Sequence, residues 1–175
     1  MTTTKKTTTR KPRATKTTKT TKASKERVKL PPNPFMHEIL DLVDQQRSKA
    51  KKIDILKEYE CECLKVLLIW NFDESVISML PEGEVPYEKN DVPVGTDHTS
   101  LRREYKQLYH FVKGGNDSLS GLRRESMYIQ MLEGLHPEEA DILTLIKDGR
   151  LSTRYKVTRD TVMEAYPDIT WGGRS

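Results

Sequence analysis

Cationic side chains near the start of the chain have the spacing that most clearly indicates a chemistry. Between positions 5 and 29 a lysine or arginine recurs every one to four residues, and no aromatic residue lies among them. Cations on such a segment neutralise phosphates and release counterions, so they bind DNA or RNA with strong salt dependence and no sequence preference. This segment cannot stack on nucleic-acid bases, because such stacking requires aromatic side chains. The predicted nucleic-acid-binding residues are Lys5, Lys6, Arg10, Lys11, Arg13, Lys16, Lys19, Lys22, Lys25, Arg27 and Lys29.

The basic segment differs in charge from the rest of the chain. Residues 1–30 hold eleven lysines and arginines against one acid, Glu26, which gives a net charge of +10. Residues 31–175 hold 19 bases and 25 acids, a net charge of −6. This asymmetry predicts that the first segment meets a polyanion, which the rest of the chain would repel. A solubilising extension that binds no specific ligand is the alternative interpretation.

A second group of basic residues lies between two predicted helices near the end of the chain. Its position suggests a helix-turn-helix, but the link from Gly149 to Val157 is much longer than the usual turn of three or four residues. Charged loop residues, with lysine complementing the dipole at a helix C-terminus, are the favoured interpretation, and phosphate contact is the alternative. This secondary basic patch comprises Lys147, Arg150, Arg154, Lys156 and Arg159.

The sequence predicts no catalytic site, no metal site and no cofactor. Cys61 and Cys63 are two positions apart, a spacing that does not place them on one face of a helix. The pair Gly114-Gly115 lacks the preceding strand and the following Lys-Ser/Thr of a phosphate-binding loop. A Gly-x-Ser-x-Gly nucleophile motif is also absent. We therefore expect a protein that is not an enzyme.

Residues 81–97 form an acidic stretch punctuated by prolines and glycines. Pro81, Gly83, Pro86, Pro93 and Gly95 predict a loop, and acids outnumber bases within it. Loops of this length without regular structure are uncommon and are often functional. We expect this acidic loop to contact a protein partner.

Short helices must position these residues. Predicted helices begin at Asn33-Pro34, Ser48, Thr99 or Ser100, Asn116, Pro137 and Thr158. Their predicted ends are about Gln46, Asn71 to Asp73, Gly114-Gly115, Gly149 and the residue before Pro167. The second helical region is expected to break near Glu60. Val76 to Leu80 fits either a short strand or a helical turn.

The fold class expected from these elements is mostly α, a single small helical-bundle domain with a disordered basic N-terminal tail. Residues 1–32 are predicted to be disordered, because Thr/Lys repeats and like charge leave nothing to bury. Residues 33–168 form the helical domain, and residues 169–175 form a flexible C-terminus. No apolar run approaches the roughly 18 residues that a membrane span needs, so we expect no membrane partner.

Four segments resemble a known family. They are Asn33-Pro34-Phe35, LPEGEVPY at 80–87, LYHFVKGGNDSL at 108–119 and RESMYIQMLEGLHPEEA at 124–140. Together they resemble an uncharacterised small-protein family of T4-like tailed phages, notably cyanobacterial myophages. The resemblance covers most of residues 33–166 and excludes the Thr/Lys tail. It implies the cytoplasm of an infected bacterial host, or the virion, and it transfers no activity.

Two functions follow as expectations. The first is a non-enzymatic phage accessory protein, whose helical domain binds a protein partner and whose tail adds non-specific nucleic-acid affinity. The alternative is a virion structural or assembly protein whose basic tail contacts packaged DNA.

Overall fold

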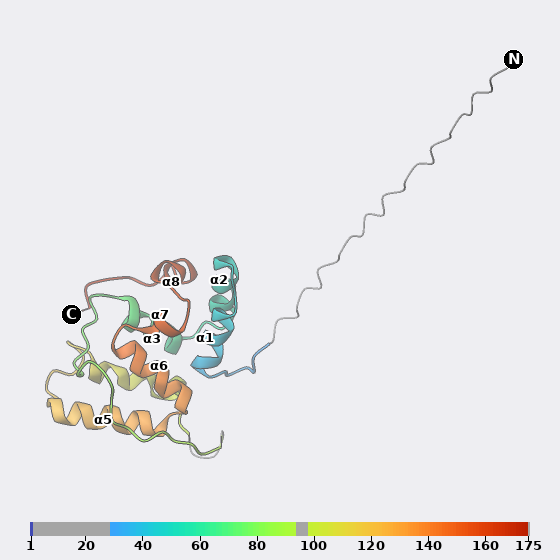
Figure 1. The fold of residues 1–175 in the computed structure, drawn as a ribbon. Coiled ribbons are helices and arrows are strands. Elements are labelled where there is room, and N and C mark those ends of the chain that lie inside the picture. Colours follow the sequence, from blue (N-terminus) through green and yellow to red (C-terminus); the bar gives the residue numbers. More distant parts are fainter. Residues whose placement is uncertain (2–28, 94–97, 175) are drawn as a thin grey trace.

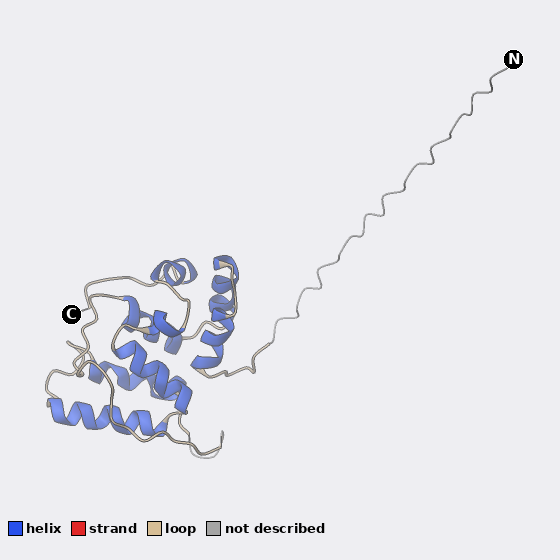
Figure 2. Ribbon diagram, in the orientation of Figure 1, coloured by secondary structure: helices blue, strands red, loops and turns tan. Residues whose placement is uncertain are grey.

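The computed structural model describes residues 1, 29–93 and 98–174, and within these ranges the protein is helical (Figure 1). Two isolated bridges, Ser78 with Val112 and Thr99 with Leu135, are the only β pairing among the described residues, and no strand is drawn there (Figure 2). The mostly α fold is thus confirmed for this part of the chain. The predictions for residues 2–28 and 94–97 lie outside the described residues.

Nine helical elements make up the fold. They are α1 (Met36–Asp44), α2 (Lys49–Glu58), α3 (Glu62–Phe72), α4 (Leu101–Glu104), the 3-10 helix η1 (Tyr105–Phe111), α5 (Gly121–Gly134), α6 (Pro137–Lys147), α7 (Leu151–Arg154) and α8 (Arg159–Ala165), counted over the described ranges. None of these helices is long and apolar enough to span a membrane.

Helix α6 is the central element. It packs against α1, α3, α5 and α7, while α2 packs against α1 and α8 at one end of the molecule (Figure 1). The side chains of Ala140, Ile142, Leu143 and Ile146 are fully buried. The stripe of Ala140, Leu143 and Ile146 recurs every three residues, as expected for a helix that buries one face.

Several helix starts agree with the sequence. Ser48 and Thr158 precede α2 and α8, and Pro137 is the first residue of α6. The predicted break near Glu60 is also confirmed, because α2 ends at Glu58 and α3 begins at Glu62. Thr158 accepts from Thr161 N–H and Pro137 fits the first helical position, whereas the Ser48 side chain makes no capping hydrogen bond.

Two predicted caps are wrong. Helix α1 begins at Met36, not after Asn33, because carboxylates satisfy its first amides: Glu38 Oε2 accepts from Phe35 N–H at 2.8 Å. Asn116 does not cap α5; its side chain contacts His110 Nδ1 at 2.9 Å and accepts from Ser118. Ser120 caps α5 instead, four residues later.

The predicted helix that begins near Ser100 is mostly a 3-10 helix. Only residues 101–104 are α-helical, and residues 105–111 follow as η1. Tertiary hydrogen bonds occupy the carbonyls at the end of η1: Phe111 O accepts from Met79 N–H at 2.8 Å, and His110 O accepts from Arg124 Nε at 2.8 Å. The sequence fits either a short strand or a helical turn over residues 76–80. In the structure, Ser78 of this segment forms an isolated antiparallel bridge with Val112.

The buried carboxylate of Glu139 joins three helix starts. It lies in the first turn of α6 and is fully buried. Its Oε1 accepts from Met36 N–H of α1 at 2.9 Å, and its Oε2 accepts from Leu101 N–H of α4 at 2.8 Å. Each helix start leaves such donors without intrahelical partners, so one side chain fixes the relative positions of α1, α4 and α6.

The segment predicted as a flexible C-terminus, residues 169–175, makes specific contacts over its described part. Asp73 Oδ2 accepts from Gly172 N–H at 3.0 Å and from Arg174 Nε at 3.1 Å. Burial opposes the ionised form of Asp73, but hydrogen bonds from Gly172, Ser75 and Arg174 lower its pKa to about 2. These contacts give residues 172–174 a defined place against the end of α3, which the sequence did not indicate.

Candidate functional site

Described residues 81–93 of the acidic loop lie across the outer side of α6 and α5 (Figure 1). No regular structure occurs between Pro81 and Pro93, as the proline and glycine spacing predicts. Gly83 adopts a φ of +96°, a conformation that favours glycine, and so allows the turn that follows Pro81. The prediction of a partner contact at this loop stays a prediction.

Hydrogen bonds fasten this segment to α6 at two levels. Near the C-terminal end of the helix, Lys147 Nζ donates to Pro81 O at 2.6 Å, and Gly83 N–H donates to Asp148 Oδ2 at 3.3 Å. Two turns earlier, Asp141 Oδ1 accepts from Tyr87 OH at 3.1 Å and from Lys89 Nζ at 2.8 Å. The segment therefore runs opposite to the direction of α6.

Asp141 is the central partner in this arrangement. Besides Tyr87 and Lys89, the guanidinium of Arg154 approaches it at 3.8 Å. Burial and the adjacent Asp141 carboxylate raise the pKa of Tyr87 to about 12. The phenol is thus neutral at physiological pH and acts as a donor that holds the segment in place.

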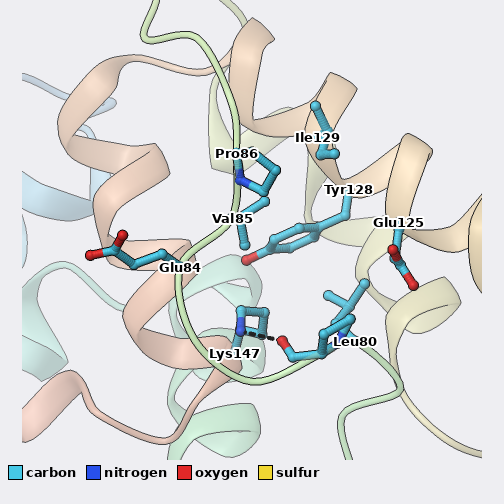
Figure 3. Close-up of a pocket in the computed structure, with 9 residues that line it drawn as sticks. Leu80, Glu84, Val85, Pro86, Glu125, Tyr128, Ile129 and Lys147 are labelled. Carbon is cyan, nitrogen blue, oxygen red and sulfur yellow. Dashed lines mark hydrogen bonds between the residues drawn. The ribbon is translucent and has the colours of Figure 1, made fainter.

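A small pocket lies where the segment meets α5 and α6 (Figure 3). Its volume is about 130 Å³, and the ring of Tyr128 projects toward its centre between Leu80 and Val85. Pro86 and Ile129 complete the apolar wall, and the carboxylates of Glu84 and Glu125 point away on opposite sides. The pocket lining is thus apolar, with two acidic groups beside it.

The polar groups of this pocket are already engaged. Tyr128 is buried and donates through its hydroxyl to Leu143 O at 3.0 Å. The Lys147 ammonium is fully buried and is held by Pro81 O and by the carboxylate of Asp148. Pockets for small ligands usually measure about 300–1,000 Å³. The arrangement fits one small apolar group, and it supplies no nucleophile or acid–base pair.

The residues of the secondary basic patch have different surroundings in the structure. Lys147 points into the body, and Arg154 lies near Asp141. Arg159 stacks over the ring of Trp171, with its guanidinium carbon 5.3 Å from the ring centroid. Arg150 and Lys156 are exposed. The sequence grouped five residues that face different surroundings, because α7 turns the chain between them and was not predicted.

Among the predicted nucleic-acid-binding residues of the basic tail, only Lys29 lies within the described ranges. Lys29 is exposed, and Leu30 N–H donates to Tyr59 OH at 3.1 Å, close to the end of α2. Leu30 also packs against the core. The other ten predicted nucleic-acid-binding residues, from Lys5 to Arg27, lie outside the described residues.

The sequence missed a cluster of histidines around the start of α6. The rings of His37 and His136 stack with centroids 5.0 Å apart, and His98 meets His136 edge-on at 5.5 Å. His37 Nε2 lies 3.1 Å from Glu138 Oε2, and burial lowers the pKa of His37. His37 and His136 occupy predicted helix starts, but no local signal indicates that these starts meet.

No group of these histidines, cysteines and acids within the described ranges has the geometry to hold a metal ion. Cys61 is half-buried and Cys63 is buried, and both are free thiols. Burial raises the pKa of Cys63 well above its ordinary value, so the thiol is protonated and unreactive at neutral pH. The contacts of these residues are therefore those of a packed core.

Comparison with known proteins gives one match. A family model described as a family of unknown function, DUF6433, matches residues 39–153, from α1 to α7. No curated protein and no solved structure matches the chain.

Proposed function

This chain belongs to the family of unknown function DUF6433, and from that premise we propose that it is a non-enzymatic accessory protein. In this proposal residues 1–30 bind nucleic acid without sequence preference, and the acidic helical body binds a protein partner. The observation that carries the proposal is the separation of charge, +10 on residues 1–30 and −6 on residues 31–175.

We also propose that a tailed phage encodes the protein and that the protein acts in the cytoplasm of the infected bacterial host. Four unusual segments between Asn33 and Ala140 support this origin by their resemblance to proteins of T4-like phages. A phage genome is a polyanion present at high local concentration, which is the ligand that the tail is suited to meet.

The body uses several of its own cations internally, which supports assigning phosphate binding to the tail. Lys52 donates to Lys156 O, Lys147 donates to Pro81 O, and the guanidinium of Arg124 donates to three carbonyls between residues 110 and 119. All three side chains belong to buried residues. They stabilise loops and are not available to a nucleic acid.

The acidic loop is the part of the body that we propose for partner contact. Glu82, Glu84 and Glu88 are exposed along it, and the apolar pocket lies beneath residues 80–86. An apolar centre with charged surroundings is a common arrangement in protein interfaces. The hydrogen bonds to Asp141 and Asp148 hold the loop ready for contact, which reduces the entropic cost of binding.

Fluorescence anisotropy with labelled duplex DNA and labelled RNA tests the role of the tail. The deletion should remove residues 1–28 and keep Lys29 and Leu30, because Leu30 is hydrogen-bonded to Tyr59. We expect the deletion to abolish binding at 50 mM salt, since tails with about 6–10 phosphate contacts dominate affinity at low ionic strength. The matched control replaces Arg150, Arg154 and Arg159 by glutamine and is expected to change affinity less than about threefold.

The result that would overturn the proposal is unchanged affinity after the deletion. Loss of binding in the triple-glutamine control, with the deletion unaffected, would move the nucleic-acid site to the secondary basic patch.

A virion structural or assembly role is the second proposal, and the same basic tail favours it because packaged DNA is also a polyanion. Mass spectrometry of purified particles separates the two roles. A stoichiometric presence in particles supports the structural role, and absence from particles supports the accessory role.

A further inference from the structure

Helix α3 is apolar on more than one face. Its core side carries Cys63, Leu64, Leu67 and Leu68, all buried. A helix at the surface normally carries polar residues on its other side. On that side α3 carries Glu62 and Lys65, but also Val66 and Ile69, which are apolar and only half-buried. The second apolar face of α3 is therefore incompletely covered by the described residues.

A groove runs between this face of α3 and the 3-10 helix η1. Its volume is about 330 Å³. Aromatic and aliphatic residues of both elements line it, together with the adjoining segments: Val66, Ile69, Trp70, Val76, Tyr105, Leu108, Tyr109 and Val112. Trp70 and Leu108 are buried, whereas the side chain of Tyr109 is 50 % exposed.

More exposed apolar side chains occur on the segment that follows Val76. Ile77 and Met79 are 44 % and 39 % exposed, on a segment held to residues 111–113 by backbone hydrogen bonds. Most large apolar residues elsewhere in the described ranges are covered. Val76, which lines the groove, directly precedes Ile77 in the chain, and a patch of exposed apolar side chains usually marks an interaction site.

The two charged side chains that line the groove are basic, although Arg174 is ion-paired with Asp73 and Glu62 lies one turn before Val66 on α3. Lys106 and Arg174 line it, and none of the described residues lining it is acidic. Arg174 is held in place by Asp73 and by Thr170 O. The chain's own tail is excluded as an occupant by its charge, because it would meet Lys106 and Arg174 with lysines and arginines.

We propose that the groove between α3 and η1 binds an acidic amphipathic helix of a partner protein. Apolar side chains spaced at i, i+3, i+4 and i+7 would enter the groove, in the mode of helices that dock between helices. Glutamates or aspartates at the flanks would meet Lys106 and Arg174, which gives the complementarity that selects a partner. The inference goes beyond the proposed function, because the groove shares no lining residue with the pocket under the acidic loop, and it names the chemistry of the partner.

Designed peptides test the inference on the full chain. The probe is a labelled 16-residue peptide with leucine and phenylalanine on one helical face and glutamate on the other. A scrambled peptide of identical composition measures the attraction between the acidic peptide and the basic tail, because it keeps the charge and loses the apolar face. We expect the amphipathic peptide to bind at least about tenfold more tightly than the scrambled one, a difference typical of a few buried anchors.

Variants in the groove locate the site. Tyr109→Ser and Lys106→Glu are both exposed changes, and each is expected to reduce the preference for the amphipathic peptide at least about threefold. The matched control is Met163→Ser, which changes an apolar residue of α8 that is 42 % exposed and outside the groove. Its preference should equal that of the wild type, and circular dichroism should show an unchanged fold for all three variants.

Equal affinity for the two peptides, or a preference that survives in both groove variants, would overturn the inference. A dimer of the wild type that becomes monomeric in Tyr109→Ser would also overturn it, because the groove would then bind a second copy of the chain. The outcome is separable from the proposed tail function: deleting residues 1–28 should remove nucleic-acid binding and leave the peptide preference unchanged.

Discussion

At the scale of single residues, the buried acid Glu139 connects three helix starts, although the sequence does not single it out. Its two carboxylate oxygens bind the first amides of α1 and α4, which are 103 and 38 positions away in the chain. Buried backbone donors without partners are rare because each costs free energy. A fully buried acid is tolerated here since it satisfies two such donors.

Replacing Glu139 by alanine is expected to destabilise the protein. The change leaves Met36 N–H and Leu101 N–H without acceptors, at about 1–3 kcal/mol for each unsatisfied donor. Urea unfolding followed by circular dichroism measures the loss. The control is Glu133→Ala, an exposed position of α5, which should change the free energy of unfolding by less than about 0.5 kcal/mol. Equal stability of Glu139→Ala and wild type would show that this contact does not hold the helix starts together.

His37 is expected to make stability depend on pH. Burial lowers its pKa below the ordinary value of 6.5; the charge of His136 lowers it further, and Glu138, Glu38 and Asp41 raise it. A group whose pKa is lowered by folding stabilises the folded state above its unfolded pKa, and this contribution is lost as pH falls. The urea midpoint of the wild type should therefore decrease between pH 7 and pH 5.

The variant His37→Gln isolates this effect. It removes the titrating group, so its midpoint should decrease less than that of the wild type over the same range. Burial raises the pKa of Glu139, which favours the folded state as pH falls, but this contribution is present in both proteins and cancels in the comparison. Parallel pH profiles for wild type and His37→Gln would rule out His37 as the source.

At the scale of elements, a helix start could be predicted where its signal lies in the residues adjacent to it in sequence. Pro137 acts through its ring and Thr158 through its hydroxyl, and Ser48 precedes α2 without a side-chain hydrogen bond to the helix. Asn33 and Asn116 carry the same local signal but do not start helices. Glu38 and Glu139 bind the first amides of α1, and the side chain of Asn116 is engaged by His110.

The contacts that hold the end of η1 were not predictable, because the partner residues are distant in sequence. Arg124 lies 14 positions after His110, whose carbonyl it binds, and Met79 lies on a segment that precedes the helix. Gly115 is also needed here, since a Cβ atom at this position would lie 1.9 Å from Tyr109 O. Such constraints come from packing and leave no periodic pattern in the sequence.

The acidic loop is expected to loosen when its central partner is removed. Asp141→Ala deletes the acceptor for Tyr87 and Lys89 and the ion partner of Arg154. Limited proteolysis should then cut within residues 82–93 faster than in the wild type, by about tenfold if one to two kcal/mol of local stability is lost. Glu125→Ala, a change on the other side of the pocket, is the control and should leave the cleavage rate unchanged. Cleavage of Asp141→Ala at the wild-type rate would mean that other contacts hold the loop.

At the scale of the whole molecule, the sequence predicts the fold class and the separation of charge but not the surface features. Eleven cations in residues 1–30 are evident from composition alone. The groove between α3 and η1 and the pocket beside Tyr128 arise from packing between elements far apart in the chain. Of the secondary basic patch, Lys147 points inward, whereas Arg150 and Lys156 are exposed.

The salt dependence of DNA binding tests the central claim most directly. The wild type is compared with a variant of equal length in which the ten lysines and arginines between Lys5 and Arg27 are replaced by glutamine. The slope of log K against log salt concentration counts the phosphates neutralised, at about −0.9 for each contact on duplex DNA. We predict a steep slope for the wild type, between about −5 and −9, and a slope near zero for the variant. Equal slopes in the two proteins would contradict the account, because the phosphates would then be neutralised by the body and not by the tail.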